Sequence, residues 1–200
     1  MVNGHRNGIE SRLWARAEFR RRAVPGRCES IRNHFLRSPD GSCAVSTSPY
    51  VESKDEDAKL FVRCGKSPRK LLSDYFRTGV AVWSPDSRTV IFIDEHSVEE
   101  YTLKLFRIDD AGASDPTFVD RAIAKDIESQ LKGKKAVFYY LNFIRFAGTS
   151  HMIMDADVIF IRKGKTSPTE EMTFRFEVDL NTGAIDLVRT ARTYRFLTNL

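Results

Sequence analysis

The chain has 200 residues, of which 42% are hydrophobic, 11% aromatic and 30% charged. This length and composition indicate one globular domain with a substantial core, and they exclude collagen-like and wholly disordered proteins. No apolar run approaches the roughly 20 residues of a membrane helix, and the first residues lack the apolar stretch of a secretory signal. The sequence therefore favours a soluble, cytoplasmic chain, with a periplasmic location as the alternative if residue 1 is not the native start.

Charge is unevenly distributed along the chain. The formal net charge is +5, yet residues 1–37 contain nine Arg and three Glu, whereas residues 38–200 contain 23 basic and 24 acidic residues. We interpret residues 1–30 as a basic, Arg-rich, disordered leader and residues 31–200 as a single domain of β repeats. Two other interpretations of the leader stay open: an organellar transit segment, or a short amphipathic helix for an anionic membrane or nucleic acid. The body is not expected to bind nucleic acid, because such binding requires phosphate neutralisation by cations.

The body contains a repeat, since residues 36–45 match residues 82–91 at a spacing of 46. Both copies contain Ser-Pro-Asp followed by Gly or Ser, which is typical of a tight turn between strands: Pro fixes φ, and Asp hydrogen-bonds the nearby backbone. Downstream, residues 59–63 resemble residues 104–108. The repeating unit is therefore a strand, the Ser-Pro-Asp turn, a second strand, an acidic loop, a third strand, a turn and a short fourth strand.

A third, degenerate copy follows. Its predicted strands span residues 137–146, 151–162, 172–180 and 184–190. The third of these alternates apolar and polar residues, which indicates one buried face, whereas Thr89–Ile93 is almost continuously apolar and is predicted to be covered on both faces.

One helix is predicted near residues 116–132. Asp115 is its expected N-cap and Pro116 its first residue, with an apolar side chain at every fourth position from Val119 to Leu131 and Gly133 just past its end. The fold class is therefore mainly β, built from antiparallel, propeller-blade-like hairpin repeats, as an incomplete propeller or an open curved sheet, with one inserted helix.

The motifs RSPDG and WSPDS, each followed by a hairpin that ends in LFV or LFRI, resemble the WD40-like repeats of the TolB type and are similar to those of prolyl oligopeptidase propellers. The resemblance covers residues 31–121 well and residues 137–190 weakly. It implies stacked blades and partner binding in a bacterial envelope or cytoplasm. Three repeats are fewer than a closed ring usually needs, so an open sheet and an assembly completed by a partner both remain possible. Trp83 is expected to be buried between neighbouring sheets.

The three cysteines, Cys28, Cys43 and Cys64, have no metal-ligand spacing. Cys43 and Cys64 fall in neighbouring predicted strands and can lie close enough to bridge, but free buried thiols in a reducing compartment are the favoured interpretation.

Candidate site residues gather in the predicted hairpin loops. Asp94 and His96 alternate along a strand and share one side, so they are the candidates for a carboxylate–imidazole pair in catalysis, against the alternative of a solvated loop. If the units stack like blades, their acidic loops meet at one edge suited to a basic partner segment or a divalent cation. The binding candidates of that edge are Glu52, Asp55, Asp57, Glu95, Glu99 and Glu100, with Glu170 and Glu171 in the third loop.

The sequence contains no nucleophile, phosphate-binding or zinc-protease motif. We therefore expect no cofactor and no dedicated metal site, and another protein as partner. The leading function is a non-enzymatic interaction module of TolB-like propeller-repeat type. The alternative is a hydrolase or metal-dependent enzyme that uses the acidic loop around His96.

Overall fold

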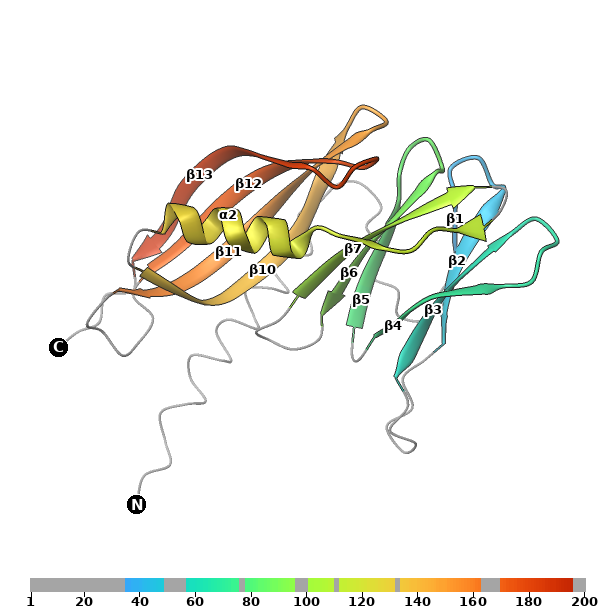
Figure 1. The fold of residues 1–200 in the computed structure, drawn as a ribbon, viewed down its shortest axis with the longest axis horizontal. Helices are drawn as coiled ribbons and strands as arrows, with labels where there is room; N and C mark the ends of the chain where they lie inside the picture. The colour runs from blue at the N-terminus through green and yellow to red at the C-terminus, as the bar shows by residue number, and fades with distance from the viewer. Residues whose placement is uncertain are drawn as a thin grey trace, which may run out of the picture.

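The computed structural model describes residues 35–48, 57–75, 78–95, 101–109, 112–131, 134–162 and 170–195. Within these ranges the chain forms three antiparallel sheets and one helix (Figure 1). The predicted mainly-β fold of antiparallel hairpin repeats is thus confirmed. The predicted leader, residues 1–30, lies outside the described residues.

Sheet 1 is the first repeat. Its strands pair in the order β1-β2-β3-β4 and span Phe35–Arg37 (β1), Cys43–Ser48 (β2), Ala58–Cys64 (β3) and Lys70–Tyr75 (β4). A register shift between Leu60 and Phe61 lets both Leu72 and Ser73 of β4 face the second sheet. The order of strands along the chain is the order in the sheet, as a meander of hairpins requires.

Sheet 2 is the second repeat, with the strand order β5-β6-β7-β8. Its strands span Thr78–Trp83 (β5), Thr89–Glu95 (β6), Tyr101–Asp109 (β7) and Gly112–Ala113 (β8), and Thr117–Phe118 (β9) also pairs with β7. The apolar run in β6 is covered on both faces, as predicted. Val90 and Phe92 pack toward sheet 1, whereas Ile91 and Ile93 pack toward the C-terminal part of the chain.

Sheet 3 is the degenerate third repeat, and its strands are longer. They pair in the order β10-β11-β12-β13 and span Lys134–Ala147 (β10), His151–Arg162 (β11), Glu170–Asp179 (β12) and Ile185–Arg195 (β13). Met152, Met154, Phe174 and Phe176 point to one face and are almost fully buried. These four side chains belong to the core cluster that sheet 3 shares with sheet 2 and the helix, and Ile153 and Ile159 of β11, which point to the opposite face, are buried as well.

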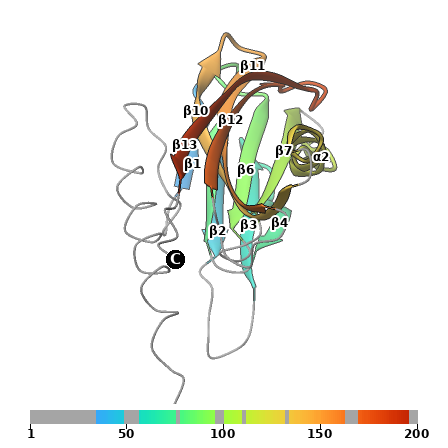
Figure 2. The same cartoon turned by 90° about the vertical axis from the view of Figure 1, so that its left-hand side faces the viewer.

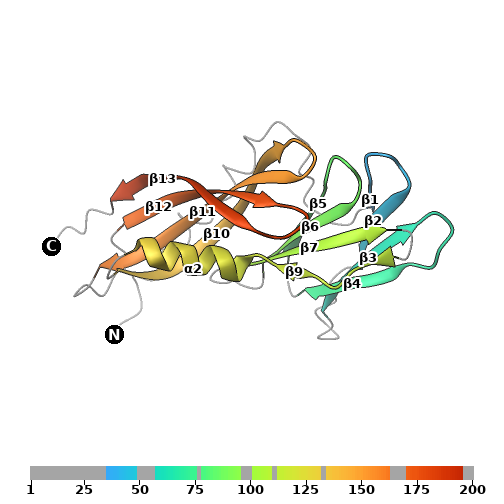
Figure 3. The ribbon, with the colours of Figure 1, turned by 45° about the horizontal axis from the view of Figure 1, so that its top comes forward.

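The three sheets stack side by side, with sheet 2 between the other two (Figure 3). One core cluster joins sheet 1 to sheet 2, and a second joins sheet 2, the helix and sheet 3. Seen from one end, the helix lies beside β7 rather than between two strands of a sheet (Figure 2). This stack leaves one face of sheet 1 and one face of sheet 3 outside the two clusters.

The helix is present but shorter than predicted. Helix α2 spans Asp120–Gln130, with Val119 at its N-cap, and therefore begins four residues after Pro116. The reason is that Thr117 and Phe118 pair with β7, and the amide of Val119 donates to the carbonyl oxygen of Leu103 at 3.0 Å. Thr117 and Phe118, which the capping signals place in the helix, are instead paired with β7. Among the described residues, no helix combines the length and apolarity that a bilayer crossing demands.

The expectation of free thiols was wrong, since Cys43 and Cys64 form a disulfide. They are directly opposed in the β2–β3 pair, with Cα atoms 4.0 Å apart. The amide of Gly65 donates to the carbonyl oxygen of Ser42, so the cysteines occupy the closer, non-hydrogen-bonded type of pair. Sequence spacing alone could not show which residues of two strands face each other.

Reduction of this disulfide is expected to destabilise the chain by about 2 to 4 kcal/mol, because the bond closes a loop of moderate length in the unfolded state. Urea unfolding of the native protein and of a Cys43→Ser/Cys64→Ser variant measures the difference. Alkylation without reductant should label one thiol per native chain and three per reduced chain. Labelling of all three without reductant contradicts the pairing.

Candidate binding edge

The turns of all three repeats lie at the same end of the stack, which we call the turn edge (Figure 1). The two Ser-Pro-Asp turns, residues 38–42 and 84–88, touch each other there. The amide of Asp40 donates to Ser87 Oγ at 3.0 Å. In the strands below, Trp83 Nε1 donates to the carbonyl oxygen of Leu36 at 3.1 Å. These bonds fix the relative position of the first two repeats.

Each Ser-Pro-Asp turn has the same internal hydrogen bond. Ser38 Oγ donates to Asp40 Oδ1 at 2.6 Å, and Ser84 Oγ donates to Asp86 Oδ1 at 2.6 Å. The residue after each Asp has a positive φ, 75° at Gly41 and 64° at Ser87. The repeated motif is therefore explained locally: serine and aspartate close the turn, and a small residue accepts the left-handed backbone.

Hydrogen bonds hold the pKa of the exposed Asp40 carboxyl at about 2, chiefly the bond from Ser38 and then those from Ser42. A carboxyl whose pKa is lowered on folding stabilises the fold above its ordinary pKa of 3.8, and this contribution is lost as the pH falls toward 2. We expect a carboxyl ¹³C titration of Asp40 to show a midpoint near 2, and Ser38→Ala to raise it. A midpoint near 3.8 in the native protein contradicts this hydrogen-bond network.

A groove of about 780 Å³ runs along the turn edge of the first two repeats. Its floor contains the buried side chains of Cys43, Ser87 and Ile108. Its exposed rim carries three cations and three carboxylates, namely Lys66, Arg88, Arg107, Asp40, Asp86 and Asp109. A groove with both signs of charge and an exposed rim suits an extended polar segment better than a small apolar ligand.

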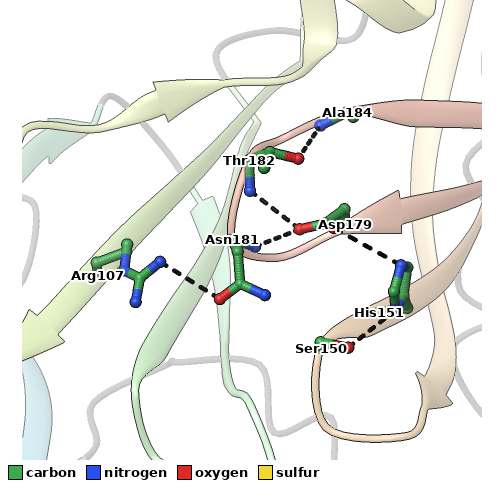
Figure 4. Close-up of polar contacts among 7 residues, drawn as sticks. All are labelled: Arg107, Ser150, His151, Asp179, Asn181, Thr182 and Ala184. Atoms are coloured by element: carbon green, nitrogen blue, oxygen red, sulfur yellow. Dashed lines mark hydrogen bonds and ion pairs between the residues drawn. The ribbon is translucent and has the colours of Figure 1, made fainter.

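The third repeat joins the same edge through Arg107. Its Nη1 atom donates to Asn181 Oδ1 at 3.3 Å, so a residue of the groove rim contacts the β12–β13 turn (Figure 4). Asp179 Oδ1 accepts the amides of Asn181 and Thr182, and these bonds lower the pKa of Asp179. The amide of Leu180 donates to the carbonyl oxygen of Ser150, which ties the two turns of sheet 3 together.

Ser150, His151 and Asp179 form a short polar array beside this contact (Figure 4). Ser150 Oγ lies 3.0 Å from His151 Nδ1, and His151 Nε2 lies 3.7 Å from Asp179 Oδ2. The second distance exceeds hydrogen-bond reach, and His151 is 39% exposed. The array stabilises two adjoining turns, and it lacks the close base–carboxylate contact that orients a catalytic histidine.

Asp94 is not in a solvated loop, so that interpretation was wrong for this residue. It lies within β6, its side chain is 0% exposed, and it accepts a 2.9 Å ion-paired hydrogen bond from Lys104 Nζ. Lys104 also donates to Ser73 Oγ of sheet 1. Asp94 lies two residues after Phe92 in β6, so its side chain points to the same face of the strand. This face packs toward sheet 1, and Asp94 is therefore buried between sheets 1 and 2.

The other predicted residues of the acidic edge are mostly beyond the described residues. Asp57 is exposed just before β3, and Glu95 ends β6. The remaining catalytic and binding candidates lie outside the described residues, namely Glu52, Asp55, His96, Glu99 and Glu100. Convergence of these carboxylates stays a prediction.

Glu170 and Glu171 are not at a loop tip, contrary to expectation. Both begin β12 and are buried, and Glu170 Oε2 accepts a 3.3 Å hydrogen bond from Lys134 Nζ. Pairing of Glu170 with Phe160 extends the strand by two residues beyond the predicted start. Among the described residues, no group of three or more His, Cys, Asp or Glu side chains is arranged to hold a metal ion.

The sequence analysis interpreted the Ser-Pro-Asp turns only as connections between strands and did not predict that they line a groove. Their repetition at a constant spacing was the available signal, because equivalent turns of stacked units meet at one edge. The contact between Arg107 and Asn181 could not be predicted, because a single hydrogen bond between residues 74 apart has no sequence pattern.

Comparison with known proteins gives little further information. No protein-family model and no curated protein sequence matches the chain. A structural likeness was found to TolB from Acinetobacter baumannii, with 13% sequence identity and a TM-score of 0.38. The match covers 79% of this chain and 32% of that one, so the chain spans about a third of the length of the protein it matches.

Proposed function

We propose that this chain is a non-enzymatic protein-interaction module of TolB-like propeller-repeat type that binds a partner along the turn edge. The main observation in support of this proposal is the groove along the turn edge. It lies between two turns that are locked together by the bond from Asp40 to Ser87 Oγ, so its shape exists before a partner arrives. A preformed groove avoids the free energy of ordering loops on binding.

The mixed charge of the rim indicates the partner's chemistry. Lys66, Arg88 and Arg107 share the rim with three carboxylates, which favours an extended peptide segment that carries both signs of charge. The disulfide in sheet 1 agrees with an oxidising compartment. We therefore prefer a periplasmic to a cytoplasmic location for the chain and its partner.

Binding of a captured partner to groove variants tests the proposal. Proteins cross-linked to the full chain are identified, purified and titrated against the native protein and a Lys66→Glu/Arg88→Glu variant. We expect at least a tenfold rise in Kd for the variant, because each of its two substitutions replaces a cation on the rim with a carboxylate. Lys125→Glu, an exposed charge on α2, is the matched control and should leave Kd unchanged.

Equal binding by the native protein and the groove variant contradicts the proposal. The rival hydrolase or metal-dependent enzyme, which uses the acidic loop around His96, gains support if the purified chain hydrolyses ester or peptide substrates and loses that activity in His96→Ala. That variant leaves the groove rim intact, because His96 is not among the residues that line the groove.

A further inference from the structure

The disulfide of sheet 1 lies in the groove at which a partner is proposed to bind. Cys43 and Cys64 both line this groove. Cys43 begins β2 and is buried, whereas Cys64 ends β3 and is partly exposed. Exposed disulfides exchange with thiols more readily than buried structural ones. A molecule bound along the turn edge therefore lies against a sulfur–sulfur bond that a thiol can reach.

Cys64 is the accessible end of this bond. An attacking thiolate approaches one sulfur atom from the side opposite to the other sulfur atom. Cys43 belongs to the core between sheets 1 and 2, so packed side chains surround it. Beside Cys64 the groove is open, because a Cβ added at Gly65 would meet no atom within 4 Å apart from its chain neighbours. The structure therefore favours attack at Cys64 and departure of Cys43.

Cys43 has a hydrogen-bond donor beside its sulfur atom. Ser42 Oγ donates to Cys43 Sγ at 3.7 Å and also to Asp40 Oδ1 at 2.8 Å. One hydroxyl proton serves both acceptors, and a thiolate at Cys43 competes for it more strongly than a neutral disulfide sulfur does. The groove rim adds no net charge among the described residues, since its three cations are matched by three carboxylates. The Ser42 hydroxyl is therefore the described group that favours Cys43 as the leaving thiolate.

Strands β2 and β3 are paired independently of the disulfide. Their register is continuous from Cys43 to Ser48 of β2, so backbone hydrogen bonds join the two strands along their length. Just beyond the cysteines, the amide of Gly65 donates to the carbonyl oxygen of Ser42 at 2.9 Å. Opening of the disulfide removes a covalent cross-link and leaves these hydrogen bonds in place. We therefore expect the groove to keep its walls while the sulfur atoms react.

We infer that the groove contains a thiol-exchange site, which binds a cysteine of an extended peptide segment covalently and reversibly. The thiolate of that cysteine attacks Cys64 Sγ, the bond between Cys64 and Cys43 breaks, and its electron pair leaves on Cys43 Sγ as a thiolate. One disulfide is lost and one is formed, so the step needs no oxidant or reductant besides the incoming thiol. Attack of the Cys43 thiolate on Cys64 Sγ reverses the step and releases the peptide. The peptide as occupant rests on the proposed function, whereas the exchange itself does not.

Reduced glutathione tests the exchange in the full-length chain. Cys28→Ser removes the third cysteine, so the groove pair supplies both remaining sulfur atoms of the cysteines. The oxidised variant is mixed with glutathione, alkylated with N-ethylmaleimide at early times and mapped by mass spectrometry. We expect glutathione on Cys64 and the alkyl group on Cys43. Absence of an adduct in the folded chain overturns the inference, and so does glutathione on Cys43 with an alkylated Cys64.

Low concentrations of urea separate exchange in the groove from exchange after unfolding. If a thiol reached the sulfur atoms only in the unfolded chain, the rate would follow the unfolded population, which rises exponentially with urea. We expect instead a rate that changes less than twofold over the urea range in which circular dichroism shows a folded chain. An exponential rise throughout that range overturns the inference.

Two matched variants test which sulfur atom is accessible. Cys43→Ala and Cys64→Ala, each combined with Cys28→Ser, both lack the disulfide, so both lose the same cross-link. Circular dichroism establishes that each is folded. Oxidised glutathione should modify Cys64 of the first variant at least tenfold faster than Cys43 of the second. Equal or reversed rates overturn attack at Cys64.

Replacement of Ser42 tests the leaving group. Ser42→Ala, in the Cys28→Ser background, should slow the reaction with glutathione about tenfold, which is the size of one lost hydrogen bond to a charged group. Ser46→Ala is the matched control, since Ser46 lies on the same strand and pairs with Phe35 and Phe61 on the other face of sheet 1. An unchanged rate in Ser42→Ala overturns departure of Cys43 as a hydrogen-bonded thiolate.

This outcome is distinguishable from that of the groove-partner experiment. If glutathione does not react and Lys66→Glu/Arg88→Glu still weakens partner binding, the exchange site is overturned and the proposed function stands. If glutathione reacts and partner binding is equal in the groove variant, the proposed function fails and the exchange chemistry stands. A bound partner whose cross-linked segment contains no cysteine overturns the peptide cysteine as the incoming thiol.

Discussion

Replacement of Trp83 by Ala is expected to lower the free energy of unfolding by about 3 to 5 kcal/mol, the range for truncating a large aromatic core residue. Trp83 is 5% exposed and belongs to the core between sheets 1 and 2. Its Nε1 atom also donates to the carbonyl oxygen of Leu36 in the first repeat. The variant therefore loses packing and leaves a partly buried acceptor without its donor.

Urea unfolding monitored by circular dichroism measures this loss. Trp83→Phe separates the two contributions, because it keeps most of the ring volume and should cost about 1 kcal/mol for the lost hydrogen bond, plus a smaller packing loss. Val188→Ala is the matched control, since Val188 is more than half exposed and its truncation should change stability little. A near-neutral Trp83→Ala means that the first two sheets do not pack as described.

Removal of the Asp94 carboxylate is expected to cost a similar amount, about 3 to 5 kcal/mol, because it leaves the buried Lys104 ammonium without its partner. The Lys104 side chain is 9% exposed and Asp94 is fully buried. Lys104 Nζ also donates to Ser73 Oγ at 2.9 Å, so the pair links sheet 2 to sheet 1. The expected penalty comes from burial of an unpaired charge rather than from loss of a surface ion pair.

A double-mutant cycle tests this explanation. Asp94→Ala and Lys104→Met are measured singly and together by urea unfolding at neutral pH. The double variant should be more stable than Asp94→Ala alone, because it contains no unpaired buried charge. Strictly additive losses contradict the explanation and indicate that the two side chains do not interact.

The sequence alone was sufficient for the fold class, and the reason is local. Ser38-Pro39-Asp40 and Ser84-Pro85-Asp86 close their turns with their own side chains, so the same letters give the same turn in both repeats. The alternation in β12 likewise predicts one buried face, and the continuous apolar run in β6 predicts two. Burial of Trp83 followed from its place before a turn in such a stack, and the structure confirms it.

Features that depend on which distant residues meet needed the tertiary structure. Helix α2 begins at Asp120 because Thr117 and Phe118 pair with Leu105 and Lys104 of β7, which lie 12 and 14 residues earlier in the chain. Cys43 and Cys64 form a disulfide because the β2–β3 register opposes them. Asp94 is buried because Lys104, ten residues away in the sequence, supplies the compensating charge.

The candidate site shows the same division. Sequence patterns located the turns but placed the binding surface in the acidic loops, because runs of carboxylates are conspicuous and a groove formed by two separated turns is not. The contact of Asp40 with Ser87, 47 residues apart, brings together two of the turns that line that groove. Local chemistry thus determined the secondary structure and the repeat, whereas strand register and sheet stacking decided which polar side chains became buried pairs and which formed a surface.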